Sequence, residues 1–329
     1  LSSHKGLNLP GVKVNLPALT PKDEADLDFM IENEFEYAGL SFVQSAGDIR
    51  RMRDYIGGRG SGIRIVAKIE KPAALDDLEG ILAETDGVMV ARGDLGVELS
   101  VECVPSAQKK ILRSAAEANV LSITATQMLE SMTRNPVPTR AEAGDVANAV
   151  FDGTDALMLS GETAVGKYPV ETVAMAASIA TEAEKSTEAW SAEHLRNHKA
   201  GADFADSICH AAAVTAEDLG ASAIVVGTQT GETALLMSKF RPSVRVVGIS
   251  ADEKNVRRMA AMYGVYPMHM PRMDNLEESV SLAAEHLVSS GVAAEGDIIV
   301  LTFGAPLQGR GMTNMLRLAR IGDRYGVDE

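Results

Sequence analysis

The sequence has few cysteines, no long uncharged apolar run and a deficit of positive charge. Only Cys103 and Cys209 occur among its 329 residues, so cysteine can supply neither a disulfide framework nor a thiolate metal site. Both lie in helix-like apolar patterns, where we expect buried free thiols. No run of about 18 uncharged apolar residues and no secretory leader pattern is present. These absences predict a cytoplasmic protein that makes no membrane contact.

The deficit of positive charge restricts the partners of the protein. The chain carries 31 Lys and Arg against 46 Asp and Glu, a formal net charge of −15. Nucleic acid and anionic membranes would be repelled, so we exclude both as general partners. An anionic substrate then requires a local positive site or a bound cation. The 46% of hydrophobic residues indicates a globular protein, and the length allows two domains.

Short β-rich segments alternate with helix-like patterns in the first half of the chain. The strand-like segments are 37–42, 63–70, 87–93, 120–126 and 155–161, and the helix-like ones are 21–34, 48–56, 73–85, 107–119 and 170–185. Thr20 before Pro21, and the capping-box pattern from Thr139 to Glu142, mark two helix starts. Such alternation predicts βαβ units and a parallel sheet.

The polar residues of the strand-like segments stand at their carboxyl ends. They are Ser41, Lys68, Glu70, Arg92, Asp94, Thr126, Ser160 and Glu162. A (β/α)8 barrel keeps its chemistry at this edge. A doubly wound sheet also binds ligands there, so the pattern by itself favours the barrel only modestly.

Residues 186–202 show no apolar periodicity and mark the best domain boundary. After them, strand-like segments at 223–228, 244–250 and 298–303 are separated by helix-like segments at 203–219, 232–240, 253–262 and 276–291. The Met-rich stretch 256–273 indicates core packing. This second half predicts a separate three-layer α/β domain.

Lys68 and Glu70 lie two residues apart in a strand-like segment, so they face the same side. The pair has two interpretations, an ordinary ion pair at a strand end or one face of an active site. The next strand-like segment ends at Gly93 and Asp94. Glycine permits close approach of a ligand, and free amides at a helix start bind anions. Carboxylates on two adjacent strands can share a hard cation.

Several long motifs resemble those of the pyruvate kinase family. They are KGLNLPG and LPALTPKD near the start, IRIVAKIEKPAAL, MVARGDLGVEL, the run from TATQMLESMTRNPVP to LSGETAVGKYP, and GDIIVLTFGAPLQGRGMTN in the tail. The resemblance implies a remnant of a small lid domain at 1–10, a partial (β/α)8 TIM barrel of about strands 4 to 8 at 11–186, and a C-terminal three-layer α/β regulatory domain at 187–329. Because five barrel strands leave two open sheet edges, we expect these residues to belong to a longer enzyme and to be inactive alone.

The resemblance also implies an activity, the transfer of a phosphoryl group from phosphoenolpyruvate to ADP, which gives pyruvate and ATP in glycolysis. Glu70 and Asp94 would be the ligands of Mg²⁺ or Mn²⁺, and Lys68 would neutralise charge on the transferring group. A K⁺ ion is implied as well, with ligands outside this chain. The amides of Gly93 and Asp94, with the Thr126 hydroxyl, would hold the substrate carboxylate.

The remaining implied roles have simpler alternatives. Thr126, Ser160 and Glu162 are candidates for delivering a proton to the enolate through water, while hydrogen bonds that cap loops are the alternative for Ser160 and Glu162. Arg92 is expected to brace the site, and the helix that starts near Arg140 to support it and to make subunit contacts. Lys5 would face the nucleotide phosphates, unless it is simply an exposed lysine near a terminus.

The stretch TQTGET after a strand matches the family's sugar-phosphate loop. It implies an effector site, for a sugar phosphate or AMP, formed by Thr228, Thr230, Gly231, Thr233 and Arg310. Glu232 would repel a phosphate, and ordinary helix capping is the alternative. The family also implies a homotetramer.

Two rival functions remain. A carbon–carbon lyase acting on phosphoenolpyruvate or pyruvate could use Lys, Glu and Asp at strand ends, but it has no need of the TQTGET domain, and nucleotide dependence separates the two. A regulatory module without catalysis is the other, for which effector binding without ADP turnover would be diagnostic.

Overall fold

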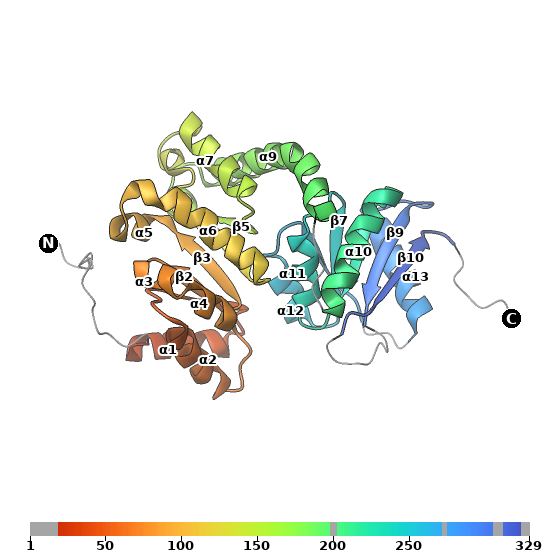
Figure 1. Cartoon of the computed structure of the whole chain (residues 1–329), viewed down its shortest axis with the longest axis horizontal. Helices are drawn as coiled ribbons and strands as arrows, with labels where there is room; N and C mark the ends of the chain where they lie inside the picture. Colours follow the sequence, from red (N-terminus) through yellow and green to blue (C-terminus); the bar gives the residue numbers. More distant parts are fainter. Residues whose placement is uncertain (1–18, 198–202, 272–274, 305–311, 324–329) are drawn as a thin grey trace. The chain divides into compact units, whose positions relative to one another are not determined.

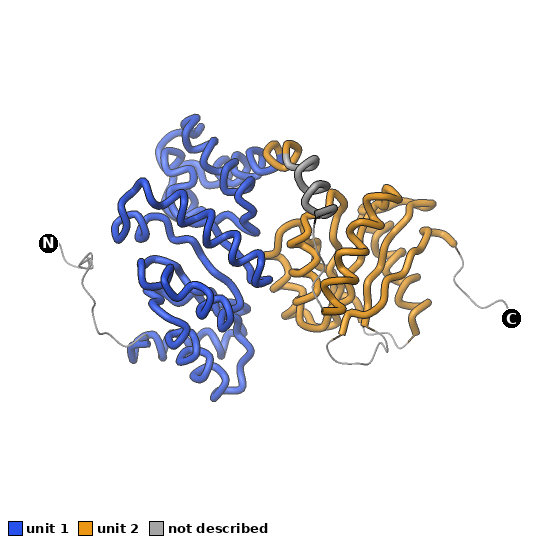
Figure 2. The backbone as a smooth tube through the Cα atoms, viewed as in Figure 1, with its two compact units in different colours: residues 1–181 blue, residues 182–329 orange. Residues whose placement is uncertain are grey.

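The chain divides into two compact units, Leu1–Thr181 and Glu182–Glu329 (Figure 2). The computed structural model describes residues 19–197, 203–271, 275–304 and 312–323. The boundary predicted at 10/11 falls outside these residues, and the boundary predicted at 186/187 lies inside helix α9 (Pro169–Asn197). Both domain limits stay predictions.

A parallel five-stranded sheet organises the first unit. Its strands are β1 (Tyr37–Leu40), β2 (Arg64–Ile69), β3 (Gly87–Ala91), β4 (Leu121–Ala125) and β5 (Ala156–Met158). They pair in chain order, β1-β2-β3-β4-β5, with every neighbouring pair parallel. All five strands predicted for this half are confirmed. Parallel strands that neighbour each other in chain order are the arrangement found along a barrel wall.

The helices of this unit begin where the sequence supplies caps. They are α1 (Pro21–Glu32), α2 (Ala46–Gly57), α3 (Pro72–Asp76), α4 (Leu78–Glu84), α5 (Arg92–Glu98), α6 (Val104–Glu117), α7 (Arg140–Phe151), α8 (Gly161–Ala164) and α9, with short 3₁₀ turns η1 (Val101–Cys103) and η2 (Glu130–Thr133). Thr20 caps α1 ahead of Pro21 and Thr139 forms a capping box, as predicted; Thr20 proves to form a capping box too, with Asp23, and Ser45 forms a third. Each box satisfies amides that the first helical turn leaves unpaired.

The core of the first unit lies between the sheet and its helices. Ile65, Ala67 and Ile69 of β2 are fully buried and cluster with Ile49 of α2 and Ile81 of α4. Figure 1 shows α4 and α6 lying along β2 and β3. Burial of each large aliphatic side chain contributes about 1.5–3 kcal/mol. Because side chains alternate along a strand, the helix-facing set at 65, 67 and 69 directs Lys68 to the opposite face of the sheet.

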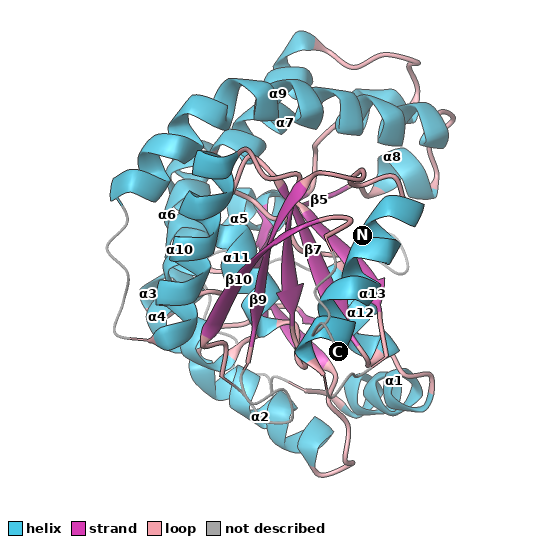
Figure 3. Ribbon diagram, turned by 90° about the vertical axis from the view of Figure 1, so that its right-hand side faces the viewer, coloured by secondary structure: helices cyan, strands magenta, loops and turns pink. Residues whose placement is uncertain are grey.

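The second unit is a mixed sheet with helices on both faces (Figure 3). Its strands are β6 (Ala223–Gly227), β7 (Arg245–Ser250), β8 (Val265–His269), β9 (Ile298–Phe303) and β10 (Met315–Arg320), and its helices are α10 (Phe204–Leu219), α11 (Glu232–Lys239), α12 (Glu253–Met259) and α13 (Leu276–Ser289). The order is β10-β9-β6-β7-β8, with only the β10–β9 pair antiparallel. The predicted three-layer α/β arrangement is confirmed.

Two strands of this sheet were not predicted. Strand β8 lies inside the Met-rich stretch that we interpreted as core packing, and it contains Pro267. Strand β10 contains two arginines, Arg317 and Arg320, and its Leu318 is exposed. Both are edge strands with one neighbour. An edge strand tolerates proline and buries less of its surface, so its sequence pattern is weaker.

The two cysteines differ in environment. Cys209 in α10 is fully buried, and burial raises the pKa of its thiol to about 12. Cys103 is exposed at the end of η1, a turn in which Val101 is also largely exposed. The prediction of a buried thiol is therefore wrong for Cys103, because the helix-like pattern around it begins one residue later, with α6. Among the described helices, none combines the length and apolarity that a bilayer crossing requires.

Candidate active site

The carboxyl end of β2 carries a charged pair that also contacts the turn after β1. The Lys68 Nζ lies 2.6 Å from Glu70 Oε1 and donates a hydrogen bond of 2.9 Å to Ser41 Oγ. The Glu70 side chain is only 1% exposed, and its Oε2 accepts the Phe42 amide at 2.8 Å. The simpler interpretation, an ion pair at a strand end, therefore describes a real contact. A buried carboxylate at this edge is nevertheless unusual for an ordinary surface pair.

Two carboxylates at this edge fit a hard divalent cation. Glu70 Oε1 is buried, and its partner within the described part of the chain is the Lys68 ammonium, 2.6 Å away in an ion pair. Asp94 is half-buried at the start of α5, and its carboxylate has no hydrogen bond or ion pair with a described residue. The described residues contain no cluster of three or more His, Cys, Asp or Glu side chains that would enclose a metal by themselves. Mg²⁺ needs only one or two carboxylates, because water and substrate oxygens complete its shell.

The ends of β3 and β4 are joined through Gly93 and Thr126. The Gly93 amide donates to Thr126 Oγ1 at 2.8 Å, and that hydroxyl donates to the Ala125 carbonyl at 2.6 Å. Thr126 has φ +69° and Gln127 φ +53°. A left-handed conformation is costly for a β-branched residue, about 1–3 kcal/mol, and such strain concentrates at functional sites. The structure therefore brings together two of the residues predicted to hold a substrate carboxylate.

Arg92 braces this corner of the site. Its guanidinium donates to the Ala125 carbonyl at 3.2 Å and to the Thr126 carbonyl at 2.6 Å, and pairs with Asp145 Oδ1 at 2.7 Å. The arginine side chain is 10% exposed. It thereby connects the strained turn after β4 to helix α7. These contacts agree with a supporting role for Arg92.

Helix α7 is itself anchored by Glu142. Its carboxylate accepts the Ser131 amide at 2.7 Å and the Thr139 amide at 2.8 Å. Burial by itself raises the pKa of this carboxyl, but the hydrogen bonds from Ser131 and Thr139 outweigh it, so the pKa of Glu142 lies below its usual value. Glu142 therefore holds the turn after β4 against the start of α7.

Glu162 is fully buried and joins the turns after β4 and β5. Its Oε1 accepts the Leu129 amide at 3.1 Å, and its Oε2 accepts the Ser160 amide at 2.7 Å. Both oxygens are thus engaged with backbone. This geometry favours the loop-capping interpretation for Glu162. Ser160 lies beside it, half-buried, at the start of α8.

Charged side chains join each neighbouring pair of turns along this edge. Ser41 and Phe42 contact the end of β2, and Lys71 after β2 pairs with Glu98 of α5 at 2.5 Å. Arg92 and Glu162 join the later turns, as described above. The edge is therefore preorganised before any ligand binds. Sequence reasoning noticed Ser41 as a polar strand end but assigned it no role, and it missed Phe42. Lys5 lies outside the described residues.

The TQTGET loop forms the start of α11 in the second unit. Gly231 has φ +89° at the N-cap, a conformation that favours glycine. Its amide donates to Thr228 Oγ1 at 2.9 Å, and Thr233 Oγ1 lies 2.9 Å from Thr313 Oγ1. The loop follows β6, where the strand order of the sheet reverses between β7 and β9. Ligands of open α/β sheets bind at such points. Arg310 lies outside the described residues.

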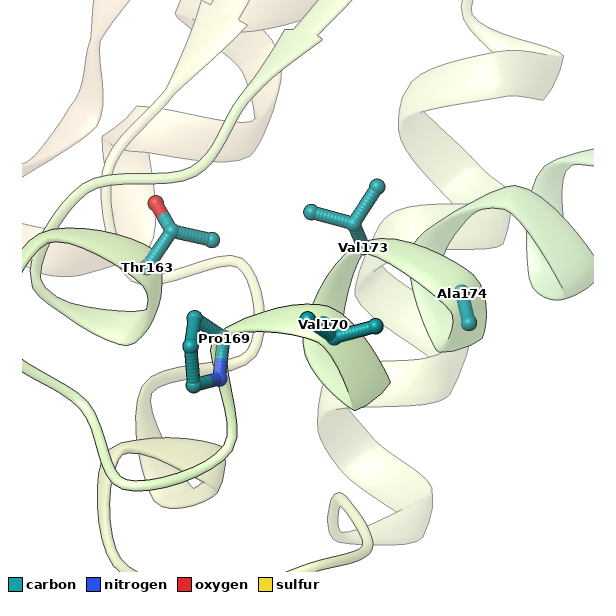
Figure 4. Close-up of a pocket in the computed structure, with 5 residues that line it drawn as sticks. All are labelled: Thr163, Pro169, Val170, Val173 and Ala174. Carbon is teal, nitrogen blue, oxygen red and sulfur yellow. The ribbon is translucent and has the colours of Figure 1, made fainter.

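An apolar depression lies at the corner between α8 and α9. It is lined by Thr163, Pro169, Val170, Val173 and Ala174 (Figure 4). The Val170 and Val173 side chains, one helical turn apart, are 76% and 54% exposed. The lining offers little polar surface for a charged substrate.

Comparison with known proteins agrees with the fold. The pyruvate kinase barrel domain matches residues 1–173, and the pyruvate kinase alpha/beta domain matches residues 206–319. The chain belongs to the pyruvate kinase family. It is 42% identical to a pyruvate kinase of Clostridium acetobutylicum over 97% of this chain and 67% of the relative, and 42% identical to one of Geobacillus stearothermophilus over 98% of this chain and 55% of the relative.

A solved structure supports the same assignment. The crystal structure of a pyruvate kinase from Cryptosporidium parvum superposes with a TM-score of 0.90 at 34% identity, over 95% of this chain and 64% of that chain. The chain thus spans between about half and two thirds of the length of the pyruvate kinases it matches. The predicted fold class, a portion of a barrel followed by an α/β domain, is confirmed.

Proposed function

We propose that this chain forms part of a pyruvate kinase that transfers a phosphoryl group from phosphoenolpyruvate to ADP. The observation that carries the proposal is the Lys68–Glu70 pair at the carboxyl edge of a parallel sheet, with the Asp94 carboxylate at the start of α5, directly after the adjacent strand β3. An ammonium beside two carboxylates suits an anionic substrate that arrives with a divalent cation. Membership of the family supports the same reaction.

The side chains divide the chemistry between them. Lys68 stabilises negative charge on the transferring phosphoryl group and on the enolate oxygen that it leaves. Gly93, Asp94 and Thr126 orient the substrate carboxylate. Glu70 and Asp94 would hold Mg²⁺ or Mn²⁺. When bound, the ion would neutralise part of the negative charge of the phosphate. K⁺, which the family resemblance implies, is bound by residues outside this chain.

Protonation of the enolate carbon completes the reaction. We assign Thr126 and Ser160 as the groups nearest a proton-carrying water. Glu162 was predicted as a third, but both of its oxygens accept backbone amides. Glu162 then acts by positioning Ser160, and its role as a proton donor is the weaker proposal.

A coupled assay on the full-length protein that carries these residues tests the function. Phosphoenolpyruvate and ADP are supplied with Mg²⁺ and K⁺, and pyruvate formation is followed. Turnover must require the nucleotide. Formation or cleavage of a carbon–carbon bond without nucleotide would instead identify the rival lyase. Turnover by residues 1–329 alone, measured in parallel, would contradict the prediction that they are inactive by themselves.

Asp94→Asn tests the metal assignment. We expect the Mg²⁺ concentration for half-maximal activity to rise roughly tenfold or more, because the amide keeps the shape of the side chain and loses its charge. Asp76→Asn, at the exposed last residue of α3, makes the same change in side chain and is the control. Activity titrations of both variants against Mg²⁺ are the measurement. A titration curve for Asp94→Asn that superposes on that of the parent would remove Asp94 from the ligand set.

The second unit is proposed to bind an anionic effector at residues 228–233 with Arg310. The amides at the start of α11 and the threonine hydroxyls support a phosphate, while Glu232 opposes it. We expect Glu232→Gln to tighten binding of fructose 1,6-bisphosphate or AMP about fivefold in calorimetry. No heat from either ligand with either protein would leave helix capping as the role of the loop.

A second copy of the chain is proposed to cover the apolar depression at α8 and α9. Val170 and Val173 support this because they are neighbouring exposed valines that line one apolar depression, and the family resemblance implies a homotetramer. We expect the double variant Val170→Asp, Val173→Asp to lose assembly in light scattering, while Val101→Asp, at another exposed valine, keeps it. An unchanged mass would contradict the interface.

Two further proposals follow from the family resemblance. The protein is cytoplasmic, and Lys5 faces the phosphates of the nucleotide.

A further inference from the structure

The turn after β1 contacts both members of the charged pair. Ser41 Oγ accepts the Lys68 ammonium at 2.9 Å, and the amide of the next residue, Phe42, donates to Glu70 Oε2 at 2.8 Å. The turn and the pair are 27 and 28 residues apart in sequence. Two consecutive residues thus hold two side chains that the proposed function uses, and neither Ser41 nor Phe42 has a role in it so far.

Phe42 adopts a conformation that phenylalanine disfavours. Its φ is +55°, in the left-handed region, where a side chain crowds the following carbonyl. The ring is 57% exposed, and its described polar neighbour is the Lys71 ammonium, 5.7 Å from the ring centroid. Burial of the ring therefore offsets little of the strain. The hydrogen bond from the Phe42 amide to a buried carboxylate is the interaction that accounts for the turn.

This hydrogen bond also leaves the two oxygens of Glu70 in different states. Oε2 accepts the Phe42 amide, whereas Oε1 forms the ion pair with Lys68 Nζ at 2.6 Å. The amide thus holds one oxygen, so that only the other, which it shares with the ammonium, can also turn its charge to a cation. Ser41 acts in the same way on the amine, because it holds one of the three ammonium protons and leaves the others for Glu70 and for a ligand.

We propose that Ser41 and Phe42 are positioning residues of the active site: the Phe42 amide directs Glu70 Oε1 toward the cation, and the Ser41 hydroxyl aims the Lys68 ammonium at the transferring group. The inference rests on the proposed function. It assigns the left-handed turn of Phe42 to site geometry, beyond the simple capping of a strand end. Neither residue is required to touch substrate.

A matched pair of variants tests the Phe42 arm. Phe42→Gly and Phe42→Val both delete the ring and keep the amide, but glycine accepts the left-handed region and the β-branched valine resists it. We expect the dissociation constant of Mn²⁺, measured by electron paramagnetic resonance on the full-length protein without substrate, to rise roughly tenfold in Phe42→Val. In Phe42→Gly it should stay within about twofold of the parent.

The Mn²⁺ measurement separates failure of the inference from failure of the proposed function. If the parent binds no Mn²⁺, the metal assignment of Glu70 and Asp94 is wrong. If the parent binds Mn²⁺ and the two Phe42 variants bind it equally, the conformation of the turn does not position Glu70, and the inference is wrong. Equal weakening in both variants would assign the effect to the ring, which also overturns it. Circular dichroism confirms that each variant is folded.

The Ser41 arm has its own pair. Ser41→Ala removes the hydroxyl that holds Lys68, and Ser41→Thr restores a hydroxyl at the same position. We expect kcat to fall roughly tenfold in Ser41→Ala, with Mn²⁺ affinity and the KM for phosphoenolpyruvate within about twofold of the parent, and to recover in Ser41→Thr. If Ser41 had only a structural role, Ser41→Ala would lower the folded fraction of the protein or change KM and kcat together. An Ala variant with unchanged kcat, or a Thr variant as slow as the Ala variant, would overturn the assignment of Ser41.

Discussion

Lys68→Met is expected to reduce phosphoryl transfer by a factor on the order of 10³, while the divalent cation still binds. The ammonium lies at the end of β2, beside Glu70, where charge develops on the reacting oxygens. Removal of a single preorganised charge donor typically lowers kcat by about 10²–10³. Methionine fills a similar volume, so the loss should reflect charge and not packing. The measurement is kcat in the coupled assay, with Mn²⁺ affinity determined separately.

The structure predicts a second, separable effect of this substitution. Glu70 is almost fully buried, and Lys68→Met leaves its carboxylate without the neighbouring ammonium. Loss of one partner of a buried pair is destabilising, here about 1–3 kcal/mol because the Phe42 amide remains. The double variant Lys68→Met, Glu70→Gln should recover most of that stability and none of the activity. Lys110→Met, on the exposed face of α6, is the matched control for the substitution.

Two outcomes would contradict a role for Lys68 in phosphoryl transfer. If Lys68→Met retained kcat within about tenfold of the control, the pair would be an ordinary strand-end ion pair. If the single variant lost activity only in proportion to its unfolded fraction, the same conclusion would follow. Active-site titration of the folded protein distinguishes these cases from a direct loss of transfer.

Glu162→Ala is expected to lower the free energy of unfolding by about 2–6 kcal/mol. The substitution leaves the amides of Leu129 and Ser160 without their acceptor in a buried position, and each unsatisfied group costs about 1–3 kcal/mol. Glu162→Gln keeps one acceptor oxygen and should lose roughly half as much. Glu117→Ala, at the exposed end of α6, should change stability by less than about 0.5 kcal/mol. Urea unfolding of the full-length proteins is the measurement.

The same variants decide between two roles for Glu162. A positioning role predicts that Glu162→Gln, once folded, exchanges the methyl protons of pyruvate with D₂O nearly as fast as the parent. A direct proton-transfer role predicts that exchange is lost while the protein remains folded. Exchange can be followed by nuclear magnetic resonance without ADP. Equal stability of Glu162→Ala and Glu117→Ala would show that the buried hydrogen bonds contribute nothing, against the prediction.

Several features of the fold were predictable because their causes are local. The five strands of the first unit follow from short β-branched runs, and the helix starts at Thr20 and Thr139 follow from capping boxes within four residues. The two edge strands of the second unit were not predicted. Strand β8 contains Pro267, which sequence patterns normally exclude from a sheet, and it is tolerated because only one side of the strand pairs. The exposure of Cys103 was missed because an apolar pattern does not show at which residue a helix begins: Cys103 lies one residue before α6.

The sequence alone determined the family, through long ordered motifs, and it determined that Lys68 and Glu70 face the same way, because side chains two apart in a strand always do. Only the tertiary structure decided what surrounds them. Sheet register brings Ser41 and Phe42 to the pair from 27 and 28 residues away, and the same register sets Glu162 against Leu129. The left-handed turns at Phe42 and Thr126 likewise have no signature in their residue types, which disfavour them. Such contacts depend on which strands become neighbours, and that is a property of the whole folded sheet.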